Sequence, residues 1–181
     1  VFTVGGCERD RIIGGIVKDV DIVVDLPNGG IEFAHWLKEN GHTEGSVVVY
    51  EHFGTAMFTL KEAPFDTIEA VQTRKECYRD MESRNPETAF GTIMEDCQRR
   101  DFTINAIAMD KDLNVIDLFG GLEDLKNKII RTVYEPQKRF TEDALRMLRA
   151  TYFSAKLNFT IEYETLSAMK KCSHLVQNLS N

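Results

Sequence analysis

Two aspartates near the start of the chain have the residue type and spacing that could do chemistry. Asp19 and Asp21 lie in the run 18–24, whose β-branched residues predict a buried strand. Side chains alternate between the faces of a strand, so these carboxylates point the same way, about 6–7 Å apart. Such close negative charges repel each other, and a bound cation would relieve the repulsion. The spacing therefore predicts a divalent-cation site, with Mg²⁺ as the preferred ion.

A pair of glycines precedes these acids. Gly5 and Gly6 follow a short apolar strand, residues 2–4, and lead into a predicted helix over residues 7–13. Glycines at such a turn let the backbone approach a phosphate, and the helix start offers free N–H groups. Arg9 adds a positive charge to the first turn. Singly, the glycines indicate only a tight turn and the aspartates only an exposed edge strand. Their order and spacing together favour a site for phosphate and metal.

The combined pattern resembles the nucleotidyltransferase superfamily related to DNA polymerase β. The string Val-Gly-Gly-Cys-Glu-Arg-Asp at residues 4–10, followed by Lys-Asp-Val-Asp at residues 18–21, is similar to its class II branch. That branch contains the CCA-adding enzymes and the bacterial poly(A) polymerases. Glu8 stands where the branch usually has an apolar residue, and we expect its side chain to face solvent.

A second motif extends the resemblance. The string Arg-Arg-Asp-Phe-Thr-Ile-Asn-Ala at residues 99–106 is typical of class II enzymes, and the resemblance implies that Arg100 contacts the nucleotide. An arginine beside a triphosphate neutralises charge and can donate two hydrogen bonds to phosphate oxygens at once. A lone Arg-Arg pair would instead indicate a solvated surface.

The resemblance also implies a third acid that supports the aspartate pair. In the family this carboxylate lies on a strand, five residues before an arginine. Glu69, on the predicted strand 67–72 and five residues before Arg74, matches that position. Asp66 is the alternative, but residues three apart face opposite sides of a strand, so only one of them can point at the metal. We expect Glu69 to be the third acid, and a half-exposed strand glutamate remains nearly as good an interpretation.

A helix predicted over residues 140–156 carries the remaining candidates. The pattern Glu-Asp-x-x-Arg-x-x-Arg at residues 142–149 resembles the motif with which class II enzymes recognise incoming bases. The resemblance implies that Asp143, Arg146 and Arg149 bind the nucleotide, because an acid and an arginine offer an acceptor and donors to a base edge. The alternative is an acid complementing the helix dipole and a solvated arginine face. The predicted apolar stripe of this helix is Ala144, Met147, Leu148, Thr151 and Ala155.

One residue of this helix departs from the family pattern. Tyr152 stands where the family often has another arginine, which puts one contact to the triphosphate or base in doubt. A tyrosine could stack or form a hydrogen bond there.

The remaining patterns predict elements around these residues. An amphipathic helix over 30–40 offers Ile31, Ala34, Trp36 and Leu37 as a buried face, and Gly41 ends it. Residues 75–92 are polar and rich in turn residues, and we expect 77–90 to be poorly ordered. Further predicted elements are strands at 46–50, 55–60, 115–119 and 129–132, and helices at 122–128 and 161–171.

Composition bounds the class of protein. The 181 residues carry a formal charge of −7, which excludes a chain coated in basic surface for nucleic acid but not an acidic metal site. No apolar run approaches the length of a membrane span, and we predict no membrane partner. Four unpatterned cysteines favour reduced thiols in a cytoplasmic protein.

The resemblance implies an α+β fold and a reaction. We expect a nucleotidyltransferase head over residues 1–135, with a small, mostly antiparallel sheet and flanking helices, and the start of a helical neck domain over 136–181. The implied activity is template-independent addition of CCA, from CTP and ATP, to the 3′ end of tRNA by a two-metal mechanism. The alternatives are a poly(A) polymerase, an enzyme adding only CC or only A, or a catalytically inactive binding module. The oligomeric state stays open.

Overall fold

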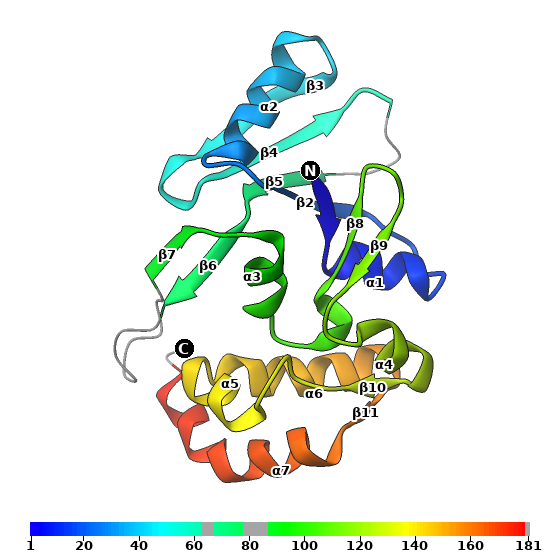
Figure 1. Ribbon diagram of the computed structural model, residues 1–181, viewed down its shortest axis with the longest axis vertical. Helices are drawn as coiled ribbons and strands as arrows, with labels where there is room; N and C mark the ends of the chain where they lie inside the picture. Colours follow the sequence, from blue (N-terminus) through cyan, green and yellow to red (C-terminus); the bar gives the residue numbers. More distant parts are fainter. Residues whose placement is uncertain (63–66, 78–86, 180–181) are drawn as a thin grey trace.

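The computed structural model describes residues 1–62, 67–77 and 87–179. Its centre is a seven-stranded sheet with strand order β3-β4-β5-β2-β1-β8-β9 (Figure 1). Within this sheet β2 and β5 are parallel and the other neighbouring pairs are antiparallel, which confirms the predicted mostly antiparallel architecture. The strands are β1 (Phe2–Val4), β2 (Asp19–Val24), β3 (Thr43–Tyr50), β4 (Thr55–Leu60), β5 (Thr67–Gln72), β8 (Ile107–Asp110) and β9 (Val115–Asp117).

Helices flank this sheet and form the other half of the molecule (Figure 1). Two further sheets have two short strands each and pair β6 with β7 and β10 with β11. The helices are α1 (Gly6–Ile12), α2 (Gly29–Glu39), α3 (Ile93–Gln98), α4 (Gly121–Asn127), α5 (Pro136–Glu142), α6 (Leu145–Leu157) and α7 (Tyr163–Cys172). The short strands are β6 (Arg74–Cys77), β7 (Glu87–Phe90), β10 (Ile129–Ile130) and β11 (Thr160–Ile161). No helix among the described residues is long and apolar enough to cross a membrane.

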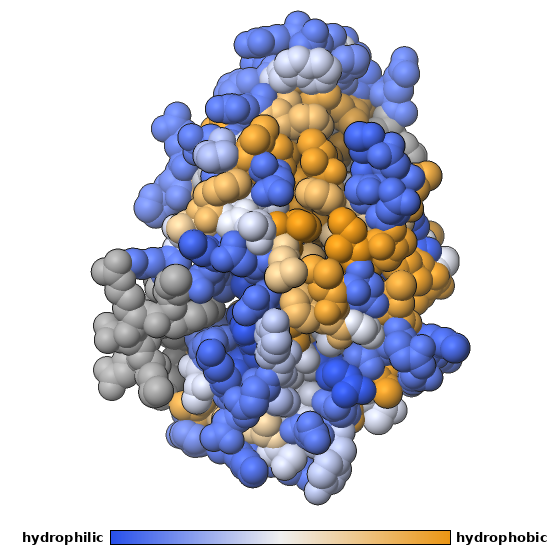
Figure 2. All heavy atoms as spheres, in the orientation of Figure 1, coloured by the Kyte–Doolittle hydropathy of each residue, from blue (hydrophilic) through white to orange (hydrophobic). Residues whose placement is uncertain are grey.

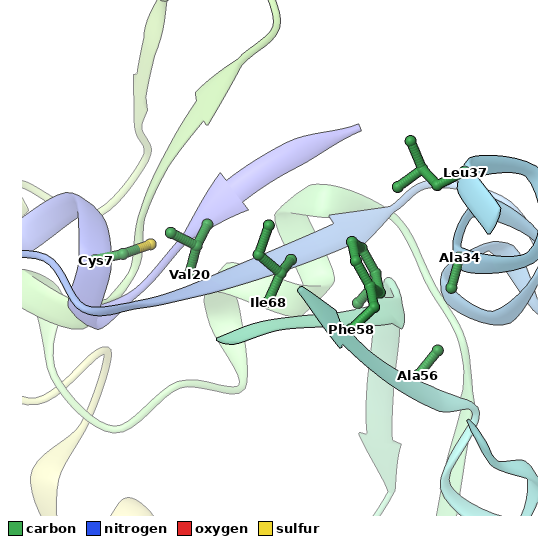
Figure 3. Close-up of a cluster of buried hydrophobic side chains, with 8 residues drawn as sticks. Cys7, Val20, Ala34, Leu37, Ala56, Phe58 and Ile68 are labelled. Atoms are coloured by element: carbon green, nitrogen blue, oxygen red, sulfur yellow. The ribbon is translucent and has the colours of Figure 1, made fainter. Parts of the chain in front are cut away.

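The two faces of β2 and β5 have different neighbours. Val20 and Ile68 pack with residues of α2 in one buried cluster, shown in Figure 3. Val23 and Val71 lie on the opposite face, in the cluster that contains Cys97 of α3. Because side chains alternate along a strand, Asp19, Asp21 and Glu69 share the α3 face. The acids therefore lie where this face of the sheet is no longer covered by apolar residues.

Helix α2 packs less of its predicted face than expected. Ala34 and Leu37 are buried as predicted, but Trp36 is 54% exposed. The indole stacks on His42, with ring centroids 5.8 Å apart, instead of entering the core. Trp36 follows the fully buried Ala34 by two residues, so it lies on the opposite side of the helix and points away from the sheet, which α2 approaches closely at Gly30.

Gly30 makes this close approach possible, and its substitution gives a test of the packing. A Cβ on Gly30 would lie 2.5 Å from both the Ala70 carbonyl oxygen and the Val71 Cα. We expect Gly30→Ala to lower the free energy of unfolding by about 3 kcal/mol, the upper end for overpacking. The control is Gly14→Ala, where nothing lies within 4 Å and only a φ of +75° opposes a side chain; it should cost about 1 kcal/mol. Equal midpoints for the two variants in urea denaturation would contradict this packing.

The helix predicted over residues 140–156 is wrong in one respect, because it is broken into α5 and α6. At the break Asp143 has an extended backbone, with φ −151° and ψ 106°. Its side chain accepts a hydrogen bond from the Leu145 N–H at 2.9 Å. Aspartate side chains compete in this way for backbone donors two residues on, and so they interrupt helices.

The apolar stripe predicted for this helix is also displaced. Leu148 is 48% exposed, and Thr151 and Ala155 are exposed too. Of the predicted stripe on α6 Met147 is buried as expected, and the other residues of α6 that face the interior are Arg146, Ala150 and Phe153. Phe153 packs on Phe102 and Ala150, so α6 shares a buried cluster with the sheet half of the chain.

The polar stretch 75–92 contains regular structure at both ends. Strands β6 and β7 pair in an antiparallel hairpin with Arg74 opposite Phe90. Thr92 then begins α3 with a capping box, in which its hydroxyl accepts from the Glu95 N–H and its own N–H donates to the Glu95 carboxylate. Residues 77 and 87–90 of the stretch predicted to be poorly ordered are therefore in strands, and residues 78–86 lie outside the described residues; the poor order itself stays a prediction. The predicted helix 161–171 begins two residues later, because Ile161 pairs with Ile130.

Glu8 contradicts the expectation of a solvent-facing side chain. The first turn of α1 lies against β2, β8 and the turn before β8, so Cys7, Glu8 and Arg9 are all buried. One carboxylate oxygen of Glu8 lies 3.5 Å from an Arg11 nitrogen, and the other has no hydrogen-bond partner among the described residues. Any side chain at position 8 would be buried by these neighbouring elements. The local sequence gives no sign of this burial.

Three of the four cysteines are free thiols in the structure, as predicted. Cys7, Cys97 and Cys172 are buried and unpaired. Burial raises the pKa of Cys97 to about 11, so this thiol stays protonated at neutral pH.

The visible face of the molecule has a hydrophobic area and a hydrophilic area. Figure 2 shows hydrophobic side chains gathered in the area of β8, β9 and α1, and the exposed hydrophobic residues of these segments include Ile12 and Val115. In the same view the half formed by α5, α6 and α7 is mostly hydrophilic.

Candidate active site

A cavity of about 570 Å³ lies between the acidic end of the sheet and α6. Eight of the ten site residues predicted from the sequence line this cavity. In the sequence they range from Gly5 to Arg149. The eight are Gly5, Gly6, Arg9, Asp21, Arg100, Asp143, Arg146 and Arg149. Glu69 lines a neighbouring cavity of about 240 Å³, and Asp21 and Arg100 line both cavities. Asp19 lines neither, but it precedes Asp21 by two residues on β2.

The acids lie on the inner strands of the sheet. β2 has β5 on one side and β1 on the other, so the interpretation of an exposed edge strand is wrong. In the register Asp21 is directly opposite Glu69. Burial raises the pKa of Asp21; the charge of Arg100 offsets part of this rise and the charge of Asp19 adds to it. Burial, and then the charge of Asp21, raises the pKa of Glu69. The fold therefore holds these carboxylates at an electrostatic cost, which a nearby positive charge would reduce.

The acids do not form a closed metal cage. Among the described residues no three His, Cys, Asp or Glu side chains gather closely enough to hold an ion by themselves. The oxygen donors of Asp19 and Asp21 nevertheless have the chemistry that a hard divalent cation requires, and both side chains keep accessible surface, that of Asp21 inside a cavity whose walls remove part of its hydration. A cation that keeps several waters and takes further oxygens from a substrate fits such an open pair of carboxylates. Asp66, the alternative third acid, lies outside the described residues.

A buried carboxylate holds the two arginines of the Arg-Arg-Asp motif. Asp96 is fully buried and accepts from Arg99 through one oxygen and from Arg100 through the other, at 2.8 and 2.9 Å for the shortest bonds. Burial alone would raise the pKa of Asp96, but the charges of Arg100 and Arg99 outweigh it and hold the pKa below its usual value. The fork geometry fixes the direction of the Arg100 guanidinium.

Gly5 allows this guanidinium to reach the turn before α1. A Cβ on Gly5 would lie 2.8 Å from Arg100 Nη1, and its φ of +79° also favours glycine. The Gly5 N–H donates to the Ile107 carbonyl, which ties the turn to β8. The glycine turn and the second motif thus meet in space, although nearly a hundred residues separate them.

Arg9 has more protein partners than its predicted role requires. Its side chain is buried, and it donates to Asn105 Oδ1 and Asp10 Oδ1, both at 2.7 Å. Its guanidinium also lies 5.0 Å from the centre of the Phe153 ring. Arg9 therefore brings positive charge to the cavity wall and also joins α1 to the helical half.

The predicted base-reading residues lie on the opposite wall of the cavity. Arg146 is buried and donates to Glu142 Oε2 at 3.0 Å and to the Arg99 carbonyl at 3.1 Å. Arg149 donates to Asp101 Oδ2 at 2.6 Å, and its guanidinium lies 5.2 Å from the centre of the Phe153 ring. With Asp143 at the break between α5 and α6, these side chains present one carboxylate and two fixed guanidinium groups to the cavity.

Sequence reasoning missed the residues that hold this wall in place. Asp96 is not among the residues predicted from the sequence, although an acid three and four residues before two arginines is a signal for helical ion pairs. Phe153 was left out of the predicted apolar stripe, although it contacts Phe102 and the guanidinium groups of Arg9 and Arg149. No local signal in the sequence reveals Phe153 as the joint between the two halves.

Comparisons with known proteins agree with this geometry. A CCA-adding enzyme from Levilactobacillus brevis is 42% identical over 183 residues, which is 99% of this chain and 43% of that protein. One from Ligilactobacillus salivarius is 39% identical over 180 residues, with 42% of that protein covered. The structure of the Bacillus stearothermophilus CCA-adding enzyme in complex with CTP is similar, with a TM-score of 0.78 and 33% identity. The match covers 99% of this chain and 40% of the Bacillus chain.

A tRNA nucleotidyltransferase solved with a primer tRNA and an incoming ATP analogue matches 97% of the chain, with a TM-score of 0.77 and 35% identity. The chain spans about two fifths of the length of the curated relatives it matches. Residues 1–131, which are most of the chain, match the sequence pattern of one protein family. That family is described as the poly A polymerase head domain. The chain therefore belongs to the poly A polymerase head domain family.

Proposed function

We propose that this chain is the catalytic part of an RNA nucleotidyltransferase that adds CMP and AMP, from CTP and ATP, to the 3′ end of tRNA. The observation that carries the proposal is the single cavity lined by an acid, by phosphate-binding candidates and by base-reading candidates. The names of the relatives support it, because they are CCA-adding enzymes and include structures with CTP and with a primer tRNA. In this proposal residues 1–135 are the head and 136–181 begin a helical neck.

Asp19 and Asp21 are the proposed metal ligands, with Glu69 supporting them from the neighbouring strand. Divalent cations, with Mg²⁺ as the preferred ion, would activate the 3′-hydroxyl and neutralise the leaving oxygens when bound there. The raised pKa values of Asp21 and Glu69 support a need for positive charge at this place.

The other wall residues bind and orient the nucleotide. Arg100 carries its charge at the glycine turn, where it neutralises triphosphate oxygens, and Arg9 adds a second charge beside it. Gly5 and Gly6 keep the turn free of side chains, so a phosphate can approach the backbone. The 3′-hydroxyl of the RNA then attacks the α-phosphate, and pyrophosphate leaves.

Asp143, Arg146 and Arg149 are the proposed readers of the incoming base. The amino group of cytosine or adenine donates to a carboxylate, and the ring nitrogen accepts from a guanidinium. Uracil and guanine present the reverse pattern and leave unpaired or repulsive contacts. Protein side chains thus perform the selection that a template strand would perform.

Selectivity gives a direct prediction for Asp143. Asp143→Asn should lower the ratio of kcat/KM for CTP to that for UTP by roughly 5- to 150-fold, because an amide can donate as well as accept. Asparagine forms the same turn to the Leu145 N–H, so stability should change by less than about 0.5 kcal/mol. Kinetics with all four nucleotides on one tRNA acceptor measure the ratio. Uniform slowing with unchanged ratios would leave Asp143 as a helix-break residue alone.

Product analysis tests the function itself. Transcripts of one tRNA that end before the CCA, after its first C and after its second C are incubated with each nucleotide alone and with CTP and ATP together, and the products are sequenced. The proposal predicts that every transcript is completed to CCA and not beyond. Long adenosine tails would establish a poly(A) polymerase instead, CC or A alone would establish a partial enzyme, and no extension by the folded chain would favour a binding module.

A further inference from the structure

One side of α6 presents an aromatic ring between two cations to the cavity. Arg149, Tyr152 and Lys156 are spaced three and four residues apart, so they lie along one side of the helix, and all three line the cavity. The proposed function uses only Arg149 of these. Tyr152, which is exposed, and Lys156 line the same wall of the cavity and have no role in that proposal.

The ring of Tyr152 is exposed but held in place. It is 57% exposed, and it meets Phe153 edge to face, with centroids 5.3 Å apart at 63°. Phe153 itself is buried and fixed by Phe102 and by the guanidinium group of Arg9. A rigid aromatic surface that opens toward solvent can stack a base with little loss of conformational entropy.

Lys156 supplies an unneutralised charge beside this ring. Its Nζ lies over one face of the Tyr152 ring, 5.7 Å from the centre, so a base would stack on the other face. Arg149, by contrast, is paired with Asp101. Lys156 forms no ion pair with any carboxylate in residues 1–62, 67–77 and 87–179. In a chain with a net charge of −7, a cation left without a carboxylate at the cavity wall suits an anionic ligand.

We propose that Tyr152 and Lys156 bind the terminal nucleotide of the RNA acceptor, with the ring stacked on its base and the ammonium against its phosphate. This inference rests on the proposed function, in which Arg149 contacts the incoming nucleotide one turn away on the same helix. An aromatic face beside a single cation matches one base and one phosphate of single-stranded RNA. A triphosphate would require several donors and makes no use of an apolar ring face.

Separate Michaelis constants for RNA and for CTP test this assignment. Tyr152→Leu in the full chain should raise KM for a tRNA acceptor roughly 5- to 150-fold, the range for losing one base stack, and change KM for CTP far less. Tyr152→Phe keeps the ring and should lose much less RNA affinity than Tyr152→Leu. Lys156→Gln should weaken RNA binding and reduce its salt dependence. Tyr163→Leu is the matched control, because Tyr163 is 83% exposed on α7 and does not line the cavity.

Equilibrium binding of a labelled single-stranded acceptor end, without nucleotide, separates this inference from the proposed function. If the wild type binds the RNA and extends it while Tyr152→Leu binds it equally well, the inference is overturned and the function stands. A rise in KM for CTP with Tyr152→Phe and Lys156→Gln would assign the pair to the triphosphate and overturn it too. If the wild type binds RNA but adds no nucleotide, the function fails, and the loss of binding in Tyr152→Leu still decides the inference.

Discussion

Asp19→Asn and Asp21→Asn will each reduce nucleotide addition by at least about 10³-fold, because each removes a charge that holds the proposed cation. The same substitutions should leave the free energy of unfolding unchanged or raise it in metal-free buffer. The folded-state pKa of Asp21 is raised, so its ionised form destabilises the fold above the ordinary pKa of an aspartate, and an amide removes that cost. Loss of activity with retained stability is the signature of a functional acid.

Single-turnover rates at saturating nucleotide, paired with urea denaturation, measure both effects. Asp112→Asn is the control, since Asp112 is an exposed acid paired with Lys111 and does not line the cavity. The control should keep its activity. If Asp21→Asn retained near wild-type turnover with Mg²⁺, or unfolded at much lower urea concentration, the assignment of the acid pair would be wrong.

Asp96→Asn should have the largest effect on stability, because it removes the carboxylate between two arginines. Breaking a buried ion pair by removing one partner typically costs about 3–5 kcal/mol, since the other charge remains buried. Arg99 keeps Glu76 as a second partner at 3.3 Å, whereas within the described part of the chain the ion pair of Arg100 is with Asp96. Any folded Asp96→Asn protein should therefore also show a raised KM for nucleotide, because Arg100 is no longer aimed at the glycine turn.

The pH dependence separates the charge of Asp96 from its shape. Its pKa is lowered in the fold, so its contribution to stability is full above the unfolded pKa, about 4, and is lost as pH falls through the folded value. The stability difference between wild type and Asp96→Asn should thus be constant from pH 7 to about 5 and shrink in stronger acid. A difference that stayed constant at all pH values would show that shape, and not charge, stabilises this region.

The sequence predicts well whatever depends on short-range periodicity. The acids of β2, the glycine turn and the strand of Glu69 follow from alternation along strands and from the properties of glycine, and the structure brings Asp21 and Glu69 together as adjacent register partners. The mostly antiparallel sheet is confirmed as well. Metal binding by Asp19 and Asp21 and nucleotide binding by Arg100 remain proposals.

The sequence fails where long-range packing decides a residue's environment. Glu8 is buried because other elements enclose the first turn of α1, and Trp36 is exposed because α2 buries the opposite face, that of Ala34. The break at Asp143 arises from a side chain competing with the backbone, which helical periodicity does not register. Phe153 acquires its place only when α6 packs on Phe102. The environments of Glu8, Trp36 and Phe153 are thus tertiary effects, whereas the break at Asp143 is local; of these residues Asp143 and Phe153 line the cavity.

Transfer of label from the α-phosphate tests the central claim most directly. The folded chain is incubated with tRNA lacking its 3′ CCA, Mg²⁺ and CTP labelled at the α-phosphate, and both labelled RNA and released pyrophosphate are quantified. Nucleotidyl transfer predicts label in the RNA and one pyrophosphate for each nucleotide added, with both signals lost in Asp21→Asn. Release of orthophosphate without labelled RNA, or equal labelling by Asp21→Asn, would contradict the account.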